Sequence, residues 1–116
     1  MDESKRARLS QAVNFETAMD RFLNNEELLL GFLKKLSEDS SFHLYEAAMK
    51  EKRYEDAFKA AHTLKGLCGN LSLDGLFEVV SKEVEFLRGG MYSEAEELLP
   101  EVEKKYQETI EILDVI

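Results

Sequence analysis

The sequence is poor in several residue types, and each shortage excludes a class of protein. Its 116 residues include one cysteine (Cys68), one proline (Pro100) and no tryptophan. A single cysteine excludes an intramolecular disulfide framework and any metal site built from several cysteines. No apolar run approaches the roughly 18 residues of a membrane span, and the charged N-terminal segment lacks the apolar core of a signal peptide. We therefore expect a cytoplasmic protein with no membrane contact.

Basic residues are also scarce. Fifteen Lys and Arg stand against 24 Asp and Glu, which gives a net charge of -9. Nucleic-acid binding is not expected, because the phosphates would be repelled. The sequence contains no serine elbow and no phosphate-binding loop, and no carboxylate pair is singled out by an apolar pocket. Ordinary hydrolytic or nucleotide-dependent catalysis therefore has no motif to support it.

Good helix formers dominate what is present, and runs of β-branched residues are missing. Residues 1–13 are expected to be a flexible tail. From residue 14 onward, apolar residues recur at helical spacing in a short segment near 14–22. The same spacing continues in four longer segments near 26–52, 54–71, 72–88 and 93–115. Residues 14–116 are therefore predicted to form an all-α, antiparallel four-helix bundle with a short additional N-terminal helix.

Local signals predict where these helices begin and end. Asn14, Ser72 and Ser93 are expected to cap helix N-termini, and Gly89–Gly90 to stop the helix before them. The stretch "SEDSS" at 37–41 either breaks or only bends the segment 26–52. Pro100 lies inside an apolar pattern, so a kink or a short lead-in turn is expected there.

The stretch "AAHTLKGLCGN" at 60–70 places His62 opposite the apolar stripe of its helix when the residues are set about 100° apart. Lys65, Gly66 and Gly69 fall on the same outward face, as does Phe58. Each glycine costs the helix about 1 kcal/mol relative to alanine. We interpret both glycines as clearing space around an outward imidazole, and Lys65, one turn away, as attracting an anion carried on the ring.

Simpler interpretations exist for each of these residues. A lone exposed histidine usually has no function, and His43 is assigned none. A helical glycine is often a packing point, but these two lie away from the apolar stripe, which favours access. Cys68 falls on that stripe and is expected to be a small buried hydrophobe rather than a nucleophile or a metal ligand.

The segment "AAHTLKGLCGNLSLDGL" (60–76) closely resembles the signature of histidine-containing phosphotransfer (HPt) domains of two-component phosphorelays. The pattern is histidine, lysine three residues on, glycine four on and a small residue seven on. The resemblance extends over about residues 15–115, through the leucine- and phenylalanine-rich helix that precedes the signature. It departs at Ser72, where many relatives have glycine, and at Val84, where relatives often carry a glutamine or glutamate that orients the imidazole.

The resemblance implies that His62 accepts a phosphoryl group from a receiver-domain aspartate and passes it to another receiver. Lys65 would stabilise the phosphoryl charge and Gly66 would give the receiver access. The implied partners are response-regulator receiver domains and hybrid sensor histidine kinases. The chain itself would have no ATP site, autokinase activity or bound cofactor, and Mg²⁺ would be held by the receiver. A monomer is expected, since the apolar stripes can be satisfied within one bundle.

Phe58 is the best candidate for the rim of the receiver contact, and Val79 and Phe86 are weaker candidates. Two other functions remain to be separated from the relay. One is a catalytically passive receiver- or kinase-binding module that acts as a scaffold or inhibitor. The other is a histidine kinase fragment, which the absence of a glycine-rich ATP motif opposes.

Overall fold

The computed structural model describes all 116 residues, which form seven α-helices and no strands. The helices are α1 (Glu3–Leu9), α2 (Phe15–Arg21), α3 (Glu26–Leu36), α4 (Ser41–Lys50), α5 (Tyr54–Asn70), α6 (Asp74–Arg88) and α7 (Tyr92–Leu113). The prediction of an all-helical protein is therefore confirmed. None of these helices combines the length and the apolar character needed to cross a membrane.

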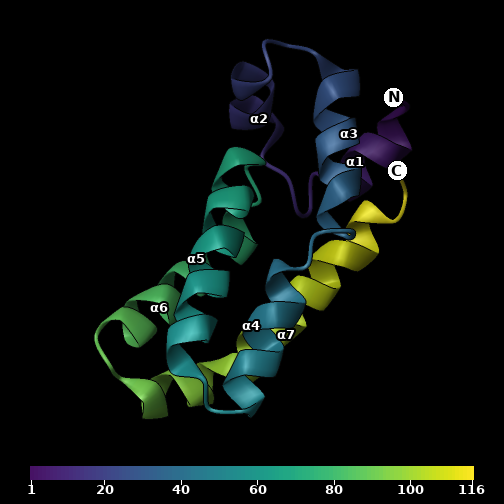
Figure 1. The fold of residues 1–116 in the computed structure, drawn as a ribbon. Helices are drawn as coiled ribbons and strands as arrows, with labels where there is room; N and C mark the ends of the chain where they lie inside the picture. Colours follow the sequence, from purple (N-terminus) through teal and green to yellow (C-terminus); the bar gives the residue numbers. More distant parts are fainter.

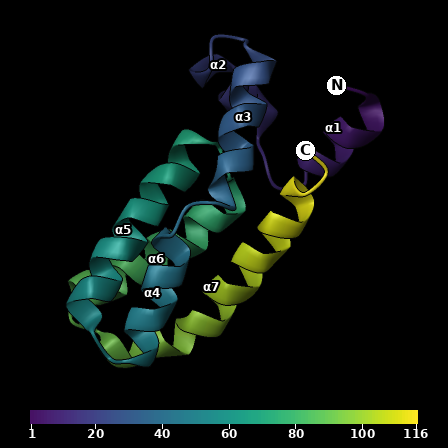
Figure 2. The same cartoon turned by 45° about the vertical axis from the view of Figure 1, so that its right-hand side comes forward.

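The four C-terminal helices pack as consecutive neighbours. Helix α4 lies against α5, α5 against α6 and α6 against α7, while α7 also touches α4 (Figures 1 and 2). The three N-terminal helices α1, α2 and α3 lie at one end of this group, which is also where the two chain termini are found. The molecule is elongated as a result, with principal extents of 43 × 23 × 19 Å.

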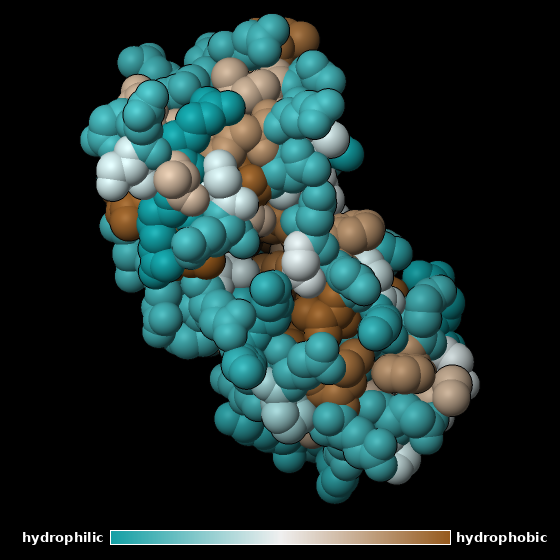
Figure 3. Space-filling model, turned by 180° about the vertical axis from the view of Figure 1, so that it is seen from behind, coloured by the Kyte–Doolittle hydropathy of each residue, from teal (hydrophilic) through white to brown (hydrophobic).

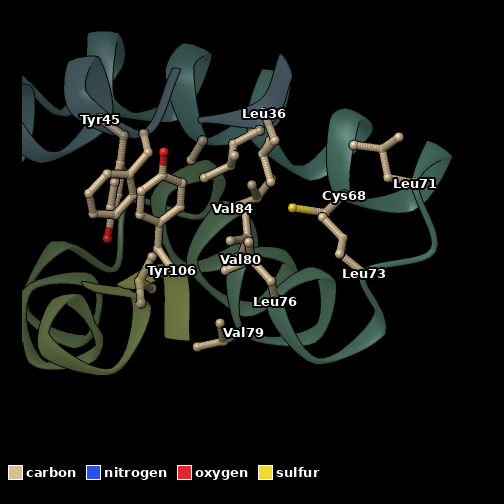
Figure 4. Packing of buried hydrophobic residues seen from close by; sticks show 14 of the residues in the cluster. Leu36, Tyr45, Cys68, Leu71, Leu73, Leu76, Val79, Val80, Val84 and Tyr106 are labelled. Carbon is tan, nitrogen blue, oxygen red and sulfur yellow. The ribbon is translucent and has the colours of Figure 1, made fainter. Parts of the chain in front are cut away.

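One core of 26 buried apolar residues runs through the molecule. Figure 4 shows part of it, with Cys68 of α5 directed toward Val80 and Val84 of α6. The Tyr106 ring of α7 stacks on Phe42 of α4 at a centroid separation of 3.9 Å. The opposite face of the molecule from Figure 1 is mainly hydrophilic, with apolar residues gathered in a strip along its middle (Figure 3). A continuous core of this kind holds α5 rigidly between its neighbours.

The N-terminal segment differs from the prediction of a flexible tail. Residues Glu3–Leu9 form α1, whose first turn is capped by the Asp2 carboxylate accepting a hydrogen bond from the Lys5 backbone N–H. Leu9 is fully buried and Val13 is 2% exposed. The tail interpretation overlooked these two apolar side chains, which join the core.

The segment 26–52, which the sequence left open as either broken or bent near 37–41, is broken into two helices. Helix α3 ends at Leu36 and α4 begins at Ser41, and the Asp39 carboxylate accepts a hydrogen bond from the Ser41 backbone N–H. This bond satisfies one of the free N–H groups at the start of α4. The N-terminal part of the fold therefore contains three helices, of which α1 was not predicted and α3 is the first half of the predicted segment 26–52.

Two of the three predicted caps are wrong. Asn14 does cap α2, since its side chain accepts from the Thr17 N–H. Ser72 instead has a φ of +55°, and α6 begins two residues later. The Ser72 hydroxyl accepts a hydrogen bond from the Thr17 hydroxyl at 2.8 Å, which ties the α5–α6 turn to α2. Ser93 lies within the first turn of α7, which begins at Tyr92.

The glycine stop after α6 is confirmed, and Pro100 is accommodated inside a helix. Helix α6 ends at Arg88, and Gly90 follows with a φ of +72°, in the left-handed region that glycine enters most easily. Helix α7 runs from Tyr92 to Leu113 with Pro100 in its interior, so the proline neither delays its start nor ends it.

Candidate functional site

Helix α5 holds the candidate histidine on the side that its neighbours leave open. Its buried residues are Ala57, Ala61, Leu64 and Cys68. They recur every three to four residues and face the core. His62 lies on the opposite side and is exposed, as predicted. The core packing therefore fixes the direction in which this imidazole leaves the helix.

The His62 imidazole has no hydrogen-bond or ion-pair partner among the side chains or the backbone. Its one aromatic contact is with Phe58, one turn earlier on α5. The two ring centroids are 5.8 Å apart and the planes are inclined by 28°. Helical side chains lean toward the N-terminus, which brings the ring at 62 over the turn that contains Phe58. Both ring nitrogens of His62 are thus uncommitted within the chain.

Lys65 places a cation on the same face. Its ammonium nitrogen lies 5.9 Å from the centroid of the Phe77 ring on α6, and it forms no salt bridge. A cation over an aromatic face keeps its charge free for an anion, whereas a carboxylate partner would neutralise it. The side chain is partly buried, so its position is fixed more firmly than that of a solvated surface lysine.

The two glycines of this face differ from each other. A Cβ atom added to Gly66 meets nothing within 4 Å, so this position opens directly to the surroundings. A Cβ atom added to Gly69 would lie 3.3 Å from Cε2 of Phe77. The prediction that Gly69 clears space for a partner is therefore corrected. Gly69 makes room for the Phe77 ring of α6, whereas Gly66 leaves the outward face bare.

The predicted rim residues also differ from one another. Phe58 is partly exposed, and the Arg88 guanidinium of α6 lies 5.2 Å from its ring centroid. Val79 is only 6% exposed and belongs to the core, so its assignment to the rim is wrong (Figure 4). Phe86 is partly buried and packs against the core. Of the three, Phe58 is the one that touches the histidine.

No acidic side chain of α6 orients the imidazole. Glu83 is fully buried, and one of its oxygens accepts a hydrogen bond from the Tyr45 hydroxyl of α4. Its other oxygen has no partner. Burial raises the pKa of Glu83 to about 7, and the bond from Tyr45 opposes that rise. The carboxylate therefore belongs to the bundle interior and not to the histidine face.

Sequence reasoning missed the buried position of Glu83 and the contact made by Arg88. Helical spacing could have predicted the burial of Glu83. Position 83 falls at the centre of the apolar face formed by Leu76, Val80 and Leu87. The Arg88 contact depends on how α5 and α6 are aligned. Phe58 contacts Arg88 near one end of the α5–α6 pair, and Gly69 lies beside Phe77 near the other end. A projection of α5 alone shows neither contact.

Cys68 behaves as predicted. Its thiol is buried, and burial raises the pKa of this group to about 12. A thiol that stays protonated is a poor nucleophile. No group of three or more His, Cys, Asp or Glu side chains is arranged to hold a metal ion.

His62 lines none of the main grooves of the molecule, although one of about 440 Å³ between α4 and α5 includes its neighbour Thr63. An apolar groove of about 460 Å³ lies between the C-terminal end of α5 and helices α2 and α3, and its walls include Phe22, Phe32 and Leu67. A charged groove of about 350 Å³ lies between α6 and α7. His62 lines neither of them. Any chemistry at this ring must therefore be enclosed by a second molecule rather than by a pocket of this chain.

Comparison with known proteins adds no assignment, since the chain matches no protein-family model, no curated protein and no solved structure.

Proposed function

We propose that this protein is a phosphorelay intermediate in which His62 carries the phosphoryl group. The observation that carries the proposal is an exposed imidazole without a partner, on a helix whose next turn is bare at Gly66. A nucleophile on an exposed helix face suits a reaction whose second reactant is supplied by another protein. A small substrate would need a pocket, and the ring lines none of the grooves described above.

The proposed step transfers a phosphoryl group between two side chains. A His62 ring nitrogen attacks the phosphorus of an aspartyl phosphate on a receiver domain. The N–P bond forms as the P–O bond to aspartate breaks, and the aspartate leaves as a carboxylate. Reversal on another receiver returns the imidazole. Both the acyl phosphate and the phosphoramidate are high-energy species, so neither direction is strongly favoured.

Lys65 and Gly66 have separate roles in this proposal. The Lys65 ammonium has no carboxylate partner and stands one turn from His62, so it is available to the negative charge on the transferring group. The bare surface at Gly66 allows the partner's active-site edge to reach the ring. The Mg²⁺ ion that such a step requires belongs to the receiver in this account.

The wider proposal follows the resemblance to HPt domains. Helices α4 to α7 would be the antiparallel four-helix bundle of that family, and the chain would act as a monomer in the cytoplasm. Its partners would be response-regulator receiver domains and hybrid sensor histidine kinases. Nucleic acid is not expected as a partner because the net charge is -9. The chain would have neither an ATP site nor autokinase activity.

The direct test loads receiver domains from the source genome with radiolabelled acetyl phosphate and mixes each with this protein. We expect label to move to the protein as an acid-labile, base-stable adduct at His62. The His62→Gln variant should take up none while keeping its helical circular dichroism. His43→Gln is the matched control, because it removes the other exposed histidine and should keep full transfer.

Two results would contradict the proposal. Equal labelling of His62→Gln places the phosphoryl group elsewhere. Labelling from ATP alone, with no receiver present, makes the chain part of a kinase instead.

A second candidate function is a binding module that blocks or scaffolds a receiver or kinase without chemistry. The observation that favours it is the set of large apolar side chains left exposed, which include Leu23, Leu28 and Leu44. Exposed apolar groups of this size are often covered by a partner. A receiver captured equally by wild type and His62→Gln, with no label transferred to either, favours this function over the relay.

A further inference from the structure

We infer that Phe58 is a positioning residue that holds the His62 ring in the orientation needed for transfer, an inference that rests on the proposed relay function. An exposed imidazole at the end of two rotatable bonds samples many directions. A displacement on phosphorus needs the attacking nitrogen aligned with the bond that breaks. Either a hydrogen bond or a packed neighbour must therefore restrict the ring, and His62 has no hydrogen bond.

The Phe58 contact has the geometry to supply that restriction. A centroid separation of 5.8 Å and an inclination of 28° describe an offset stack. Aromatic rings favour this arrangement over a face-to-face sandwich. Rotation of the imidazole about its Cβ–Cγ bond would disrupt the stack, so the contact restricts the range of ring orientations.

The Phe58 ring is itself held in place from α6. The Arg88 guanidinium lies 5.2 Å from its centroid, and the Arg88 Nε atom donates to the Glu85 carboxylate at 3.0 Å. These contacts connect a charged pair on α6 to the imidazole on α5 through one aromatic ring. Position 84, where relatives often carry an orienting amide or carboxylate, is a fully buried valine here. Phe58 is the residue of this chain that contacts the ring in its place.

The positioning role and a docking role make different kinetic predictions. A rim residue contributes binding, so its loss raises the receiver concentration needed for half the maximal rate. A positioning residue acts on the bound complex, so its loss lowers the limiting rate at saturating receiver. The stacking energy of an aromatic pair corresponds to about a two- to tenfold change in rate.

The test compares Phe58→Leu, which keeps apolar bulk, with Phe58→Tyr, which keeps the ring. We expect Phe58→Leu to lower the limiting transfer rate about two- to tenfold without raising the half-saturating receiver concentration. Phe58→Tyr should restore the wild-type rate. Phe32→Leu is the matched control, since it removes an exposed phenylalanine of α3 whose ring is tilted against Phe22 and does not contact His62.

A second readout needs no receiver. In proton NMR spectra the ring protons of His62 should be shifted upfield by the Phe58 ring current. The shift should disappear in Phe58→Leu and return in Phe58→Tyr, while the signals of His43 stay in place. This pattern reports the contact between the two rings, and the limiting transfer rate reports whether that contact matters for transfer.

The outcomes separate the two proposals. Failure of the wild-type protein to take label from any receiver overturns the relay, and the positioning role with it. Labelling of Phe58→Leu at the wild-type limiting rate, with or without weaker receiver binding, overturns the positioning role alone and leaves the relay standing.

Discussion

At the scale of single residues, Gly66 and Gly69 have the same side chain and opposite surroundings. Gly66→Gln should keep or raise the free energy of unfolding, by up to about 1 kcal/mol, because helix propensity improves and the space is open. Gly69→Gln should be less stable than Gly66→Gln by about 1–2 kcal/mol, because its Cβ presses on Phe77. Urea unfolding of both variants measures the difference.

Their effects on transfer should also differ. Gly66→Gln fills the approach to His62, so the rate of label transfer from a receiver should fall strongly although the fold is intact. A wild-type transfer rate in Gly66→Gln would remove the access role from this residue. Equal stability of the two variants would remove the packing role from Gly69.

The buried carboxylate of Glu83 makes a prediction about pH. Its pKa is raised from 4.5 to about 7 in the folded protein, so between these values the folded state binds more protons than the unfolded state. The contribution of Glu83 protonation to the free energy of unfolding is therefore fully present below about pH 4.5 and is lost as the pH rises through about 7. The shift corresponds to about 3 kcal/mol.

Glu83→Gln cannot ionise, so the fall in urea midpoint between about pH 5 and 8 should flatten in this variant. Tyr45→Phe removes the hydrogen bond that stabilises the charged form. The pKa of Glu83 should then rise further, so the fall in the urea midpoint should extend to higher pH. A pH profile of Glu83→Gln that parallels the wild type would show that other groups cause the dependence.

How well single residues were predicted depended on whether one helix decides their environment. The outward direction of His62 and the burial of Cys68 follow from the periodicity of α5 alone, and both predictions are confirmed. Gly69 and Val79 were misassigned because the neighbouring helix decides their surroundings. A projection of α5 contains no information on Phe77, which fills the space beside Gly69.

At the scale of helices, Pro100 is a defect that α7 tolerates. A proline in a helix interior removes the N–H that would donate to the carbonyl four residues earlier, which here belongs to Glu96. Pro100→Ala should restore that bond and raise the free energy of unfolding by about 1–3 kcal/mol. Chemical denaturation measures the gain. A loss of stability in Pro100→Ala would mean that the packing of α7 depends on the proline.

The helices themselves were easier to predict than their ends. Apolar periodicity placed α5, α6 and α7 within a few residues of their observed bounds. The ends depend on tertiary contacts, as Ser72 shows. Its turn takes a positive φ and bonds to Thr17 on a helix more than fifty residues away in sequence. The break at 37–40 was left open between two alternatives because serine and acidic residues occur both in helix termini and on solvated helix faces.

At the scale of the whole molecule, the N-terminal helix is part of the fold. Leu9 is fully buried in the common core, so Leu9→Ala should lower the free energy of unfolding by about 2–4 kcal/mol. Leu23→Ala is the matched control, because Leu23 is 88% exposed and its truncation should cost less than about 0.5 kcal/mol. Thermal or urea unfolding distinguishes them. A neutral Leu9→Ala would restore the interpretation of residues 1–13 as a tail.

The all-helical class was predictable from the sequence, and the placement of α1 to α3 was not. Four amphipathic segments joined by short connections leave few ways to bury their apolar faces. The short N-terminal helices have no comparable constraint within their own sequence. Their position is set by contacts with distant residues, such as the hydrogen bond from the Asn14 amide to the Asp74 carboxylate.

The single cysteine can report local opening of the fold, because its reaction with a thiol reagent depends on its exposure. Since Cys68 is sealed among α5 and α6 side chains, a thiol reagent in solution can reach it only when these helices part. With an excess of such a reagent, the rate of modification therefore measures how often α5, the helix that carries His62, separates locally from α6. Receiver binding on α5 should slow the reaction without touching the sulfur, so protein partners can be ranked without a radioactive label.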